Sequence, residues 1–220
     1  ETVLKKAKEL GYAESNPKSD LNGEDVKSKI QILSSLAFNC FINKSKINVE
    51  GINNVDQTDI KNARILGYKI KHLGVAELEN GKLIQRVNPC LVKKESYITN
   101  VNDVLNAIIV EGKPIGKLII QGEGAGSGPT VSALVSDICS ILKKNINFPF
   151  SVSLANRKKI ASLDLSNKIF SSYIRLDVLD KKGVLSSITK IMSKNQISVK
   201  RLIQNPFRSK KFASIIIVSH

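Results

Sequence analysis

Apolar side chains recur at helical spacing near the start of the chain. Positions at i, i+4, i+7 and i+11 share one helical face, and here they are Val26, Ile30, Leu33 and Ala37. Asn22 is suited to cap this helix, and carboxylates at 24 and 25 suit the positive end of the helix dipole. The pattern therefore predicts a helix from residue 22, preceded by a polar loop over 12–22 and a short helix over 1–10.

Alternation of apolar and polar positions replaces the helical spacing between residues 68 and 122. A second, shorter helix over about 58–66 is expected to end at Gly67, before this region begins. Asn80-Gly81 separates two alternating runs, which is a strong short-range signal for a tight β-hairpin. This part of the chain is therefore predicted to be mainly β-structure.

A second chain reversal and a glycine-rich loop follow the hairpin. The reversal is expected at 111–116, between two short apolar runs that read as strands. The loop spans 122–128 and leads into Pro129, whose fixed φ and missing N–H donor suit the first turn of a helix. The pattern predicts a helix from there to about residue 144.

The last part of the chain has the order strand, helix, strand, strand. Residues 173–178 alternate as a strand, and a turn follows at 180–183. The next helix has a predicted apolar stripe of Val184, Ile188 and Ile191. Two further strands are expected over 197–202 and 212–218. This βαββ order is that of a ferredoxin-like module without its second α–β pair.

These patterns give an α/β fold class with two domains. An α+β domain with a mixed sheet is predicted over 1–150, a linker over 151–168 and the truncated ferredoxin-like module over 169–220. The run Ile215–Val218 is apolar at consecutive positions, so both faces of that strand should be covered. One face can take the module's helix. The other face and the strand edge need a partner or a second helix, which favours a homo-oligomer.

Length and composition restrict the function classes. The chain has 220 residues, 42% hydrophobic and 24% charged, which is typical of a globular protein of one to two domains. This excludes a disordered tail, a collagen-like fibre and a disulfide-stapled mini-protein. No apolar run approaches the roughly 20 residues that span a bilayer. Three widely spaced cysteines and two histidines argue against structural zinc and indicate a reducing, cytoplasmic compartment.

The two ends of the chain suggest a piece of a longer protein. Residue 1 is Glu, and the one methionine is Met192. No basic-then-apolar leader is visible at the start, so no signal peptide is expected. A strand-like run ends directly before His220 without a closing element. We therefore expect a fragment that is cut at both ends.

The net charge of +15 is concentrated in the last third of the chain. Residues 1–150 carry 20 Lys and Arg against 16 Asp and Glu, whereas 151–220 carry 14 against 3. Phosphate recognition usually adds arginine and aromatic side chains, but aromatics are 5% and tryptophan is absent. We interpret the excess of positive charge as the result of a lysine-rich composition. We therefore expect neither a nucleic acid nor a membrane as a partner. A polyanion site in the basic segment stays open as an alternative.

Two regions carry residue types that chemistry could use. Asp25 and Lys29, at i and i+4, share a helix face, and a lysine beside carboxylates can donate a proton to a developing alkoxide. As an isolated pair they are more typical of an ordinary surface salt bridge. In the glycine loop, backbone N–H groups can face an anion or a carboxamide. A dinucleotide-binding fingerprint that starts at Gly122 needs glycine at position 127, where this chain has Ser127. A Walker A loop needs Gly-Lys-Ser or Gly-Lys-Thr, where this chain has Gly-Pro-Thr130.

Taken together, these motifs resemble homoserine dehydrogenase. The resemblance is carried by Gly11-Tyr-Ala-Glu14, by Asn16-Pro17 and by Asp20-Leu-Asn-Gly-x-Asp25-Val-x-x-Lys29-x-x-Ile32-Leu33. It continues in order through Asn106-Ala-Ile-x-Val-x-Gly112 and Gly122-x-Gly-Ala-Gly-Ser-Gly-Pro-Thr130-x-Ser-Ala133. The last module resembles an ACT domain, which many bacterial members of that family carry at the C-terminus.

The resemblance implies an NAD- or NADP-dependent oxidoreductase of threonine, methionine and isoleucine biosynthesis, which interconverts L-homoserine and L-aspartate 4-semialdehyde. Lys29 would be the acid/base lysine that protonates the aldehyde oxygen. Glu14 would pair with the substrate α-ammonium, and Asp25 and Asp20 would be substrate-site carboxylates. The cofactor's nicotinamide side would meet the loop glycines Gly122, Gly124 and Gly126.

The resemblance also implies regulation and a missing part. An amino-acid effector such as threonine would bind at the strand–helix connection of the ACT-like module, at Asp180, Gly183 and Val184. The family's nucleotide-binding Rossmann domain is not among these residues, so this chain alone is expected to be inactive, and no metal residues are assigned. Ser127 and Asn88 stand where many members carry a basic residue and a histidine. The alternative is a non-catalytic, amino-acid-binding regulator whose active part is the ACT-like module.

Overall fold

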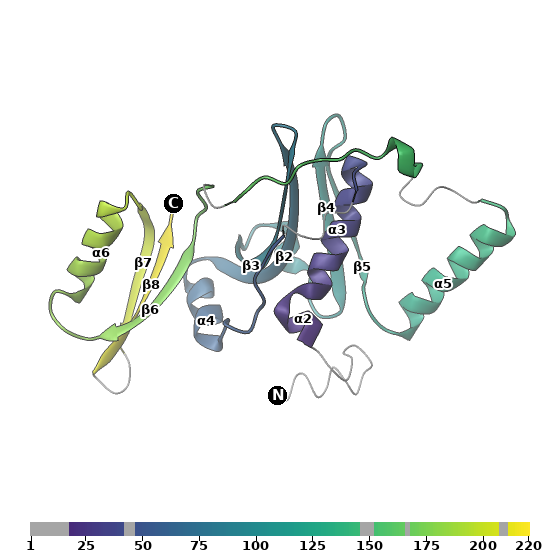
Figure 1. The fold of residues 1–220 in the computed structure, drawn as a ribbon. Helices are drawn as coiled ribbons and strands as arrows, with labels where there is room; N and C mark the ends of the chain where they lie inside the picture. The colour runs from purple at the N-terminus through teal and green to yellow at the C-terminus, as the bar shows by residue number, and fades with distance from the viewer. Residues whose placement is uncertain (1–17, 42–46, 146–151, 166–167, 207–210) are drawn as a thin grey trace. The chain divides into compact units, whose positions relative to one another are not determined.

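The chain folds into two compact units. The computed structural model describes residues 18–41, 47–145, 152–165, 168–206 and 211–220 (Figure 1). Unit 1 consists of the described residues of 1–54 and 70–163. Unit 2 consists of those of 55–69 and 164–220. The chain therefore leaves unit 1, returns to it, and passes to unit 2 a second time near residue 164. The functional domain boundaries predicted from the sequence stay predictions.

Two helices, α2 (Lys18–Asn22) and α3 (Glu24–Phe38), open the described part of unit 1. The prediction of a loop over 12–22 is wrong for its last five residues, which form α2. The N-cap position of α3 is Gly23 rather than Asn22, because a left-handed φ of 87° lets the chain turn between the two helices. Asn22 still accepts a hydrogen bond from the Glu24 backbone N–H at 3.1 Å. The helix predicted over 1–10 lies outside the described residues.

A three-stranded mixed sheet forms the centre of unit 1, as predicted. The strands are β1 (Asn48–Val49), β2 (Tyr68–Glu79) and β3 (Lys82–Lys93), in the order β1-β3-β2, with β1 parallel to β3. The predicted hairpin turn joins β2 to β3. Both of its residues, Asn80 and Gly81, have positive φ, at 49° and 74°, which is the requirement of a tight two-residue turn.

Helix α3 rests on this sheet through a face that the sequence only partly predicts. Val26 and Ile30 pack where Gly74 of β2 leaves room, because a Cβ at Gly74 would lie 3.1 Å from both side chains. Ala37, the last member of the predicted face, is exposed. The buried residues of α3 are polar; they are Gln31, Ser34 and Ser35.

Hydrogen bonds explain how α3 can bury polar side chains. The Ser34 hydroxyl donates to the backbone carbonyl of Ile30 and accepts from the Gln85 amide of β3. The Ser35 hydroxyl donates to the carbonyl of Cys40. Buried groups that are paired in this way avoid the desolvation cost of an unsatisfied donor or acceptor. The contact between α3 and the sheet therefore depends on specific pairs as well as on apolar packing.

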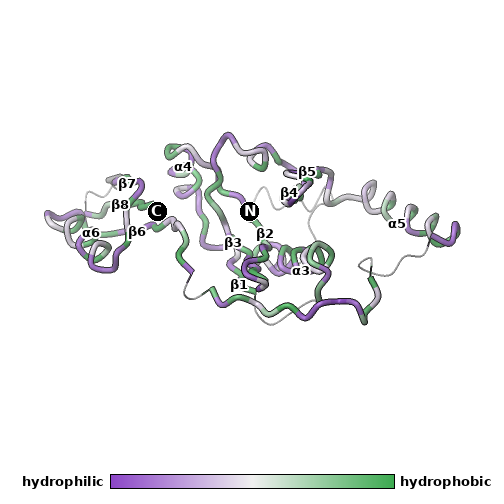
Figure 2. Tube along the Cα trace, turned by 90° about the horizontal axis from the view of Figure 1, so that it is seen from above, coloured by the Kyte–Doolittle hydropathy of each residue, from purple (hydrophilic) through white to green (hydrophobic). Residues whose placement is uncertain are grey.

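The second reversal and the following helix are confirmed. Strands β4 (Leu105–Gly112) and β5 (Gly116–Glu123) form an antiparallel pair, and α5 (Ser127–Leu142) follows with Pro129 in its first turn. Figure 2 shows hydrophobic and hydrophilic residues alternating along α5. No residue of α5 is buried. Among the described residues, no helix is long and apolar enough to span a membrane.

Residues 157–163, which the sequence assigns to a linker, are hydrogen-bonded along unit 1. Lys158 exchanges backbone hydrogen bonds with Asn39 and Phe41, at 2.9 and 3.1 Å. Leu83 of β3 donates to Ala161 at 2.9 Å and accepts from Leu163 at 2.8 Å. Short 3-10 helices occur at η1 (Tyr97–Asn100) and η3 (Leu154–Asn156).

Unit 2 contains the predicted βαββ order. Its elements are β6 (Tyr173–Leu179), α6 (Val184–Lys194), β7 (Val199–Pro206) and β8 (Phe212–Ser219), and the sheet is antiparallel in the order β6-β8-β7. The buried side of α6 differs from the predicted stripe, because Ile191 is 63% exposed. Leu185, Ile188 and Met192 pack against Ile215 and Ile217 of β8 instead. Both sets have helical spacing and share Ile188, so periodicity alone does not separate them.

The helix predicted over 58–66 is confirmed within one residue as α4 (Gln57–Ile65), and it belongs to unit 2. Tyr173 and Arg175 of β6 bond to this helix and lie opposite Val218 and Ile216 in the sheet register, so all four share one face. Ile216 and Val218 are 0% and 5% exposed, which confirms that both faces of β8 are covered. Because α4 belongs to the same chain, this face gives no argument for a homo-oligomer.

Candidate active site

The structure brings Asp25 and Lys29 together on α3. The Lys29 Nζ lies 2.8 Å from Oδ2 of Asp25, with the two side chains 57% and 38% exposed. This confirms the shared helix face that the i, i+4 spacing predicts. An exposed ion pair contributes little to stability, so the pair is available for chemistry. On the same helix, Lys27 and Glu24 form a second pair at 3.0 Å.

The two other carboxylates predicted for the substrate site are Asp20 and Glu14. Asp20 is exposed on α2, the short helix that precedes α3, which carries Lys29. Glu14 lies outside the described residues. The assignment of both to a substrate site therefore stays a prediction.

The junction between α2 and α3 is held by close packing that the sequence reasoning missed. A Cβ at Gly23 would lie 3.0 Å from Val49 of β1, 3.2 Å from the His72 ring of β2 and 3.3 Å from Val87 of β3. Only glycine combines this close approach with a left-handed φ. The sequence shows this glycine as part of the Asp20–Asp25 motif. The contacts that require glycine there come from Val49, His72 and Val87, which are distant in sequence.

Backbone hydrogen bonds hold the same junction. The Ile52 N–H donates to the carbonyl of Leu21 at 2.8 Å, and the Glu50 N–H donates to the carbonyl of Val87 at 2.7 Å. The His72 Nε2 lies 3.0 Å from the carbonyl oxygen of Glu50. The segment after β1 therefore connects α2 to the sheet, and α3 begins from a fixed point.

The three loop glycines lie close together in sequence, between β5 and α5. Gly122 is in β5 opposite Asn106, Gly124 follows the strand, and Gly126 precedes α5 with a φ of 108°. A Cβ at Gly124 would overlap the Asn106 amide, whereas a Cβ at Gly122 would meet nothing within 4 Å. Gly124 is thus explained by packing inside the chain, while Gly122 leaves open space for another group.

The predicted effector residues lie at the connection from β6 to α6. Gly183 has a φ of 89° at the N-cap position of α6, and a Cβ there would meet nothing within 4 Å. The Asp180 N–H donates to the Lys211 carbonyl at 2.9 Å, and Val184 is half-buried. A ligand at this connection stays a prediction.

The family follows from comparison with known proteins. A family model described as "Homoserine dehydrogenase" matches residues 1–139. The chain belongs to the homoserine dehydrogenase family. The homoserine dehydrogenase of Helicobacter pylori (strain ATCC 700392 / 26695) is 35% identical over 218 residues, a match that covers 99% of this chain and 51% of the relative. The chain thus spans about half the length of the curated relatives it matches.

Solved structures of the family agree in fold. A homoserine dehydrogenase from Thiobacillus denitrificans has a TM-score of 0.86 and 32% identity, and the match covers 100% of this chain and 51% of that one. A hyperthermophilic archaeal homoserine dehydrogenase mutant in complex with NADPH has a TM-score of 0.50 and 25% identity, over 67% of this chain and 41% of that one.

The three cysteines of this chain, Cys40, Cys90 and Cys139, are free thiols. Burial raises the pKa of the Cys40 thiol. Burial also raises the pKa of Cys90, against the opposing effect of the neighbouring Arg86 guanidinium. Both thiols are therefore protonated at neutral pH, whereas nucleophilic catalysis needs the thiolate. Within the described ranges, no group of three or more His, Cys, Asp or Glu is placed to hold a metal ion.

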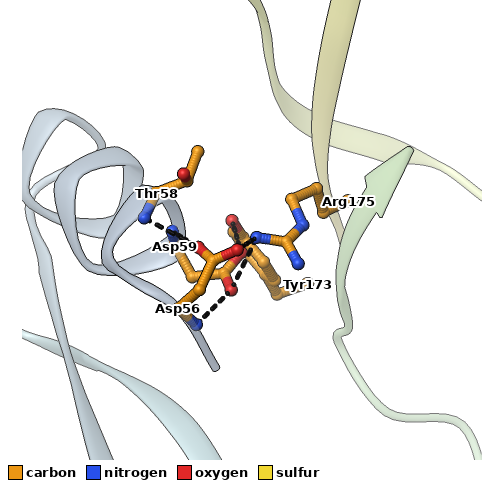
Figure 3. A network of polar contacts seen from close by, with 5 residues as sticks. All are labelled: Asp56, Thr58, Asp59, Tyr173 and Arg175. Atoms are coloured by element: carbon orange, nitrogen blue, oxygen red, sulfur yellow. Dashed lines mark hydrogen bonds and ion pairs between the residues drawn. The ribbon is translucent and has the colours of Figure 1, made fainter. Parts of the chain in front are cut away.

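Unit 2 contains a polar network that the sequence did not predict (Figure 3). Asp56 is the N-cap of α4 and forms a capping box with Asp59. From β6, the Tyr173 hydroxyl donates to Oδ1 of Asp59 at 2.8 Å, and Arg175 donates to Oδ2 of Asp59 at 3.1 Å and to Asp56. The Asp-x-x-Asp spacing of residues 56–59 could have predicted the capping box of α4, but it does not predict the partners from β6.

The network shifts the pKa values of three of its members. Burial, together with the hydrogen bond to Asp59 and its charge, raises the pKa of Tyr173 well above its ordinary value. Desolvation works to raise the pKa of Asp56, but hydrogen bonds from Arg175 and from the backbone of α4 outweigh it and lower that pKa. The hydrogen bond with Asp56 raises the pKa of Arg175. At neutral pH Tyr173 is therefore neutral, Asp56 is ionised and Arg175 is protonated.

Proposed function

We propose that this chain is part of an enzyme that interconverts L-homoserine and L-aspartate 4-semialdehyde with NAD or NADP. The observation that carries the proposal is the Asp25–Lys29 pair, at 2.8 Å on an exposed face of a helix that begins at the tightly packed Gly23. The family match over residues 1–139 includes this pair and supports the same activity.

Lys29 is the proton donor and acceptor in this proposal. In aldehyde reduction, its ammonium group gives a proton to the oxygen of the carbonyl whose carbon receives the hydride. In alcohol oxidation, its amine takes that proton back. Asp25 holds the ammonium by an ion pair, which orients Lys29 before the substrate enters.

Carboxylates around Lys29 recognise the amino-acid part of the substrate. The α-ammonium of homoserine forms charge-assisted hydrogen bonds with carboxylate oxygens. We assign Glu14 as its principal partner and Asp20 and Asp25 as supporting carboxylates. Asp25 then serves both Lys29 and the substrate, which places the reacting oxygen and the ammonium near one helix.

The loop between β5 and α5 fits the nicotinamide side of a dinucleotide. NAD or NADP, when bound, supplies or accepts the hydride. The open space at Gly122 and the left-handed backbone at Gly126 let a planar ring or its carboxamide approach the chain. The NADPH complex of the archaeal relative supports a dinucleotide as the cofactor of this chain as well.

Assembly and regulation extend the proposal to the whole protein. We infer that the enzyme is a cytoplasmic homo-oligomer of threonine, methionine and isoleucine biosynthesis. Residues 169–220 would act as an ACT-type regulatory domain, with threonine bound near Asp180, Gly183 and Val184. The βαββ order of unit 2 and the open space at Gly183 support this assignment.

Lysine substitutions in the full-length enzyme test the proposed reaction. Lys29→Ala should lower kcat by at least about a hundredfold, while the KM for homoserine changes little, because the proton transfer is lost and the carboxylates remain. Lys27→Ala is the matched control, since Lys27 forms a similar ion pair on the same helix and has no assigned role. Equal kcat values for the two variants would remove Lys29 from the mechanism.

A further inference from the structure

His72 of β2 contacts two parts of the α2–α3 junction, and all of these residues belong to unit 1. The half-buried imidazole ring lies against Gly23, since its Cε1 would be 3.2 Å from a Cβ at that position. The Nε2 atom lies 3.0 Å from the carbonyl oxygen of Glu50. A carbonyl oxygen only accepts hydrogen bonds, so Nε2 carries the hydrogen and donates it. The side chain therefore packs against the junction and also hydrogen-bonds the segment beside it.

The hydrogen bond from His72 to Glu50 reaches across the sheet. In the order β1-β3-β2, strand β3 lies between the strand that carries His72 and the segment that follows β1. The Glu50 N–H donates to the carbonyl of Val87 in β3 at 2.7 Å. The backbone of Glu50 is therefore tied to both other strands, to β3 through its N–H and to β2 through its carbonyl.

The peptide group that accepts this hydrogen bond lies against the end of α2. The carbonyl of Glu50 belongs to the peptide bond that precedes Gly51. A Cβ at Gly51 would overlap the carbonyl oxygen of Leu21 and lie 2.7 Å from Cα of Asn22. The next residue, Ile52, donates its N–H to the same Leu21 carbonyl at 2.8 Å. Because this packing leaves no spare room, the position of the end of α2 depends on the orientation of that peptide group.

The α2–α3 junction separates two sets of charged groups that we propose for the substrate. Asp20 lies on α2, whereas Asp25 and Lys29 lie on α3. The ion pair of Asp25 with Lys29 is internal to one helix, so its geometry does not depend on the junction. The distance from Asp20 to that pair does depend on it, because the chain turns between the helices at Gly23, with a φ of 87°.

We propose that His72 is a positioning residue for the candidate active site. By packing on Gly23 and holding the Glu50 carbonyl, it keeps α2 and α3 in the relative placement that homoserine needs. His72 touches neither substrate nor cofactor in this proposal and acts through the backbone of the junction. The inference rests on the proposed function and adds a residue of the sheet to the residues of the two helices.

His72→Leu in the full-length enzyme is the primary test, because leucine fills the space beside Gly23 but cannot donate a hydrogen bond. The KM for homoserine should rise about fivefold, since the placement of Asp20 is loosened. The kcat and the KM for NAD or NADP should stay within about twofold, since the ion pair of Asp25 with Lys29 is kept. His72→Phe keeps a ring without a donor and serves if His72→Leu does not fold.

His72→Gln tests whether the hydrogen bond is the cause. The amide nitrogen of glutamine can donate from a position similar to that of Nε2, so the KM for homoserine should return to within about twofold of the unchanged enzyme. A KM as high in His72→Gln as in His72→Leu would show that the bond to Glu50 does not position the site, and would overturn the proposal.

Gln85→Leu is the matched control for a general loss of stability. Gln85 of β3 also donates a hydrogen bond to α3, but at Ser34, away from the junction. This variant should lower the Tm as His72→Leu does, because it loses a sheet-to-helix hydrogen bond of the same kind. Its KM for homoserine should stay within about twofold. An unchanged KM in His72→Leu, or an equal rise in both variants, would contradict a positioning role.

Hydrogen exchange tests the same inference without turnover. The Ile52 amide is protected by its bond to Leu21, so it should exchange about tenfold faster in His72→Leu than in Gln85→Leu. Equal exchange at Ile52 in the two variants would overturn the proposal, whatever the kinetics. If the unchanged enzyme does not act on homoserine, the proposed function fails, and the exchange at Ile52 alone decides whether His72 holds the junction.

Discussion

The hydroxyl of Tyr173 donates a hydrogen bond to Asp59 across 114 residues of sequence, at 2.8 Å. This pair joins α4, a helix from the first third of the chain, to the first strand of the C-terminal sheet. It also holds α4 on the face of the sheet for which the apolar run of β8 predicts a partner or a second helix. The covered face is therefore an intramolecular interface, and its strength can be measured within one chain.

Asp59→Asn should destabilise unit 2 by about 2–4 kcal/mol, because it removes a buried charge that is paired with Arg175. Asp56→Asn is the control: the Asp56 side chain is 52% exposed, and an exposed pair contributes about 1 kcal/mol or less. Denaturant unfolding followed by circular dichroism measures the two free energies of unfolding. Equal losses would show that burial of Asp59 is not what matters.

The pH dependence of stability should change at high pH in Tyr173→Phe. The pKa of Tyr173 is raised in the folded protein, so the folded state favours the protonated phenol. Its contribution is complete below the unfolded pKa of about 10 and is lost as the pH rises toward the folded value. The difference in Tm between the unchanged protein and Tyr173→Phe should therefore be constant from about pH 7 to 9 and shrink above about pH 10. A difference that stays constant to about pH 11 would contradict this.

Gly23→Ala should cost more stability than Gly81→Ala. Both glycines have positive φ, at 87° and 74°, but only Gly23 has neighbours in reach of a Cβ. The left-handed backbone costs about 1 kcal/mol in each case, and the contacts with Val49 and His72 add about 1–3 kcal/mol at Gly23. Thermal unfolding of the two variants gives the difference. We also expect Gly23→Ala to raise the KM for homoserine, since α3 starts there.

Gly122→Ala tests whether the glycine loop meets the cofactor. The added methyl group would meet no atom of the chain within 4 Å, so the Tm should be unchanged. A methyl group in the path of the nicotinamide should raise the KM for NADPH about tenfold, the cost of roughly 1.4 kcal/mol of binding energy. Gly124→Ala is the contrasting variant, because its Cβ overlaps Asn106 and should lower the Tm. An unchanged KM in Gly122→Ala would place the cofactor elsewhere.

The local features of this protein can be predicted from its amino-acid sequence. The Asp25–Lys29 pair, the Asn80-Gly81 turn and the βαββ order all follow from spacings of a few residues. Helical periodicity and turn chemistry act over such distances, so they can be predicted without knowing the rest of the fold. The candidate site was assigned through the resemblance of its motifs to a known family, because the Asp25–Lys29 spacing alone is also that of a surface salt bridge.

The faces that these elements bury and the partners that they contact depend on the packing of the whole chain. Periodicity did not predict that α3 buries Ser34 and Ser35, because their burial depends on partners elsewhere, such as Gln85 of β3. It also did not predict that α4 joins unit 2. That choice depends on a buried carboxylate finding Tyr173 and Arg175, which lie more than a hundred residues further along the chain. Pairing at that separation is determined by the free energy of the whole packed unit, which no local pattern contains.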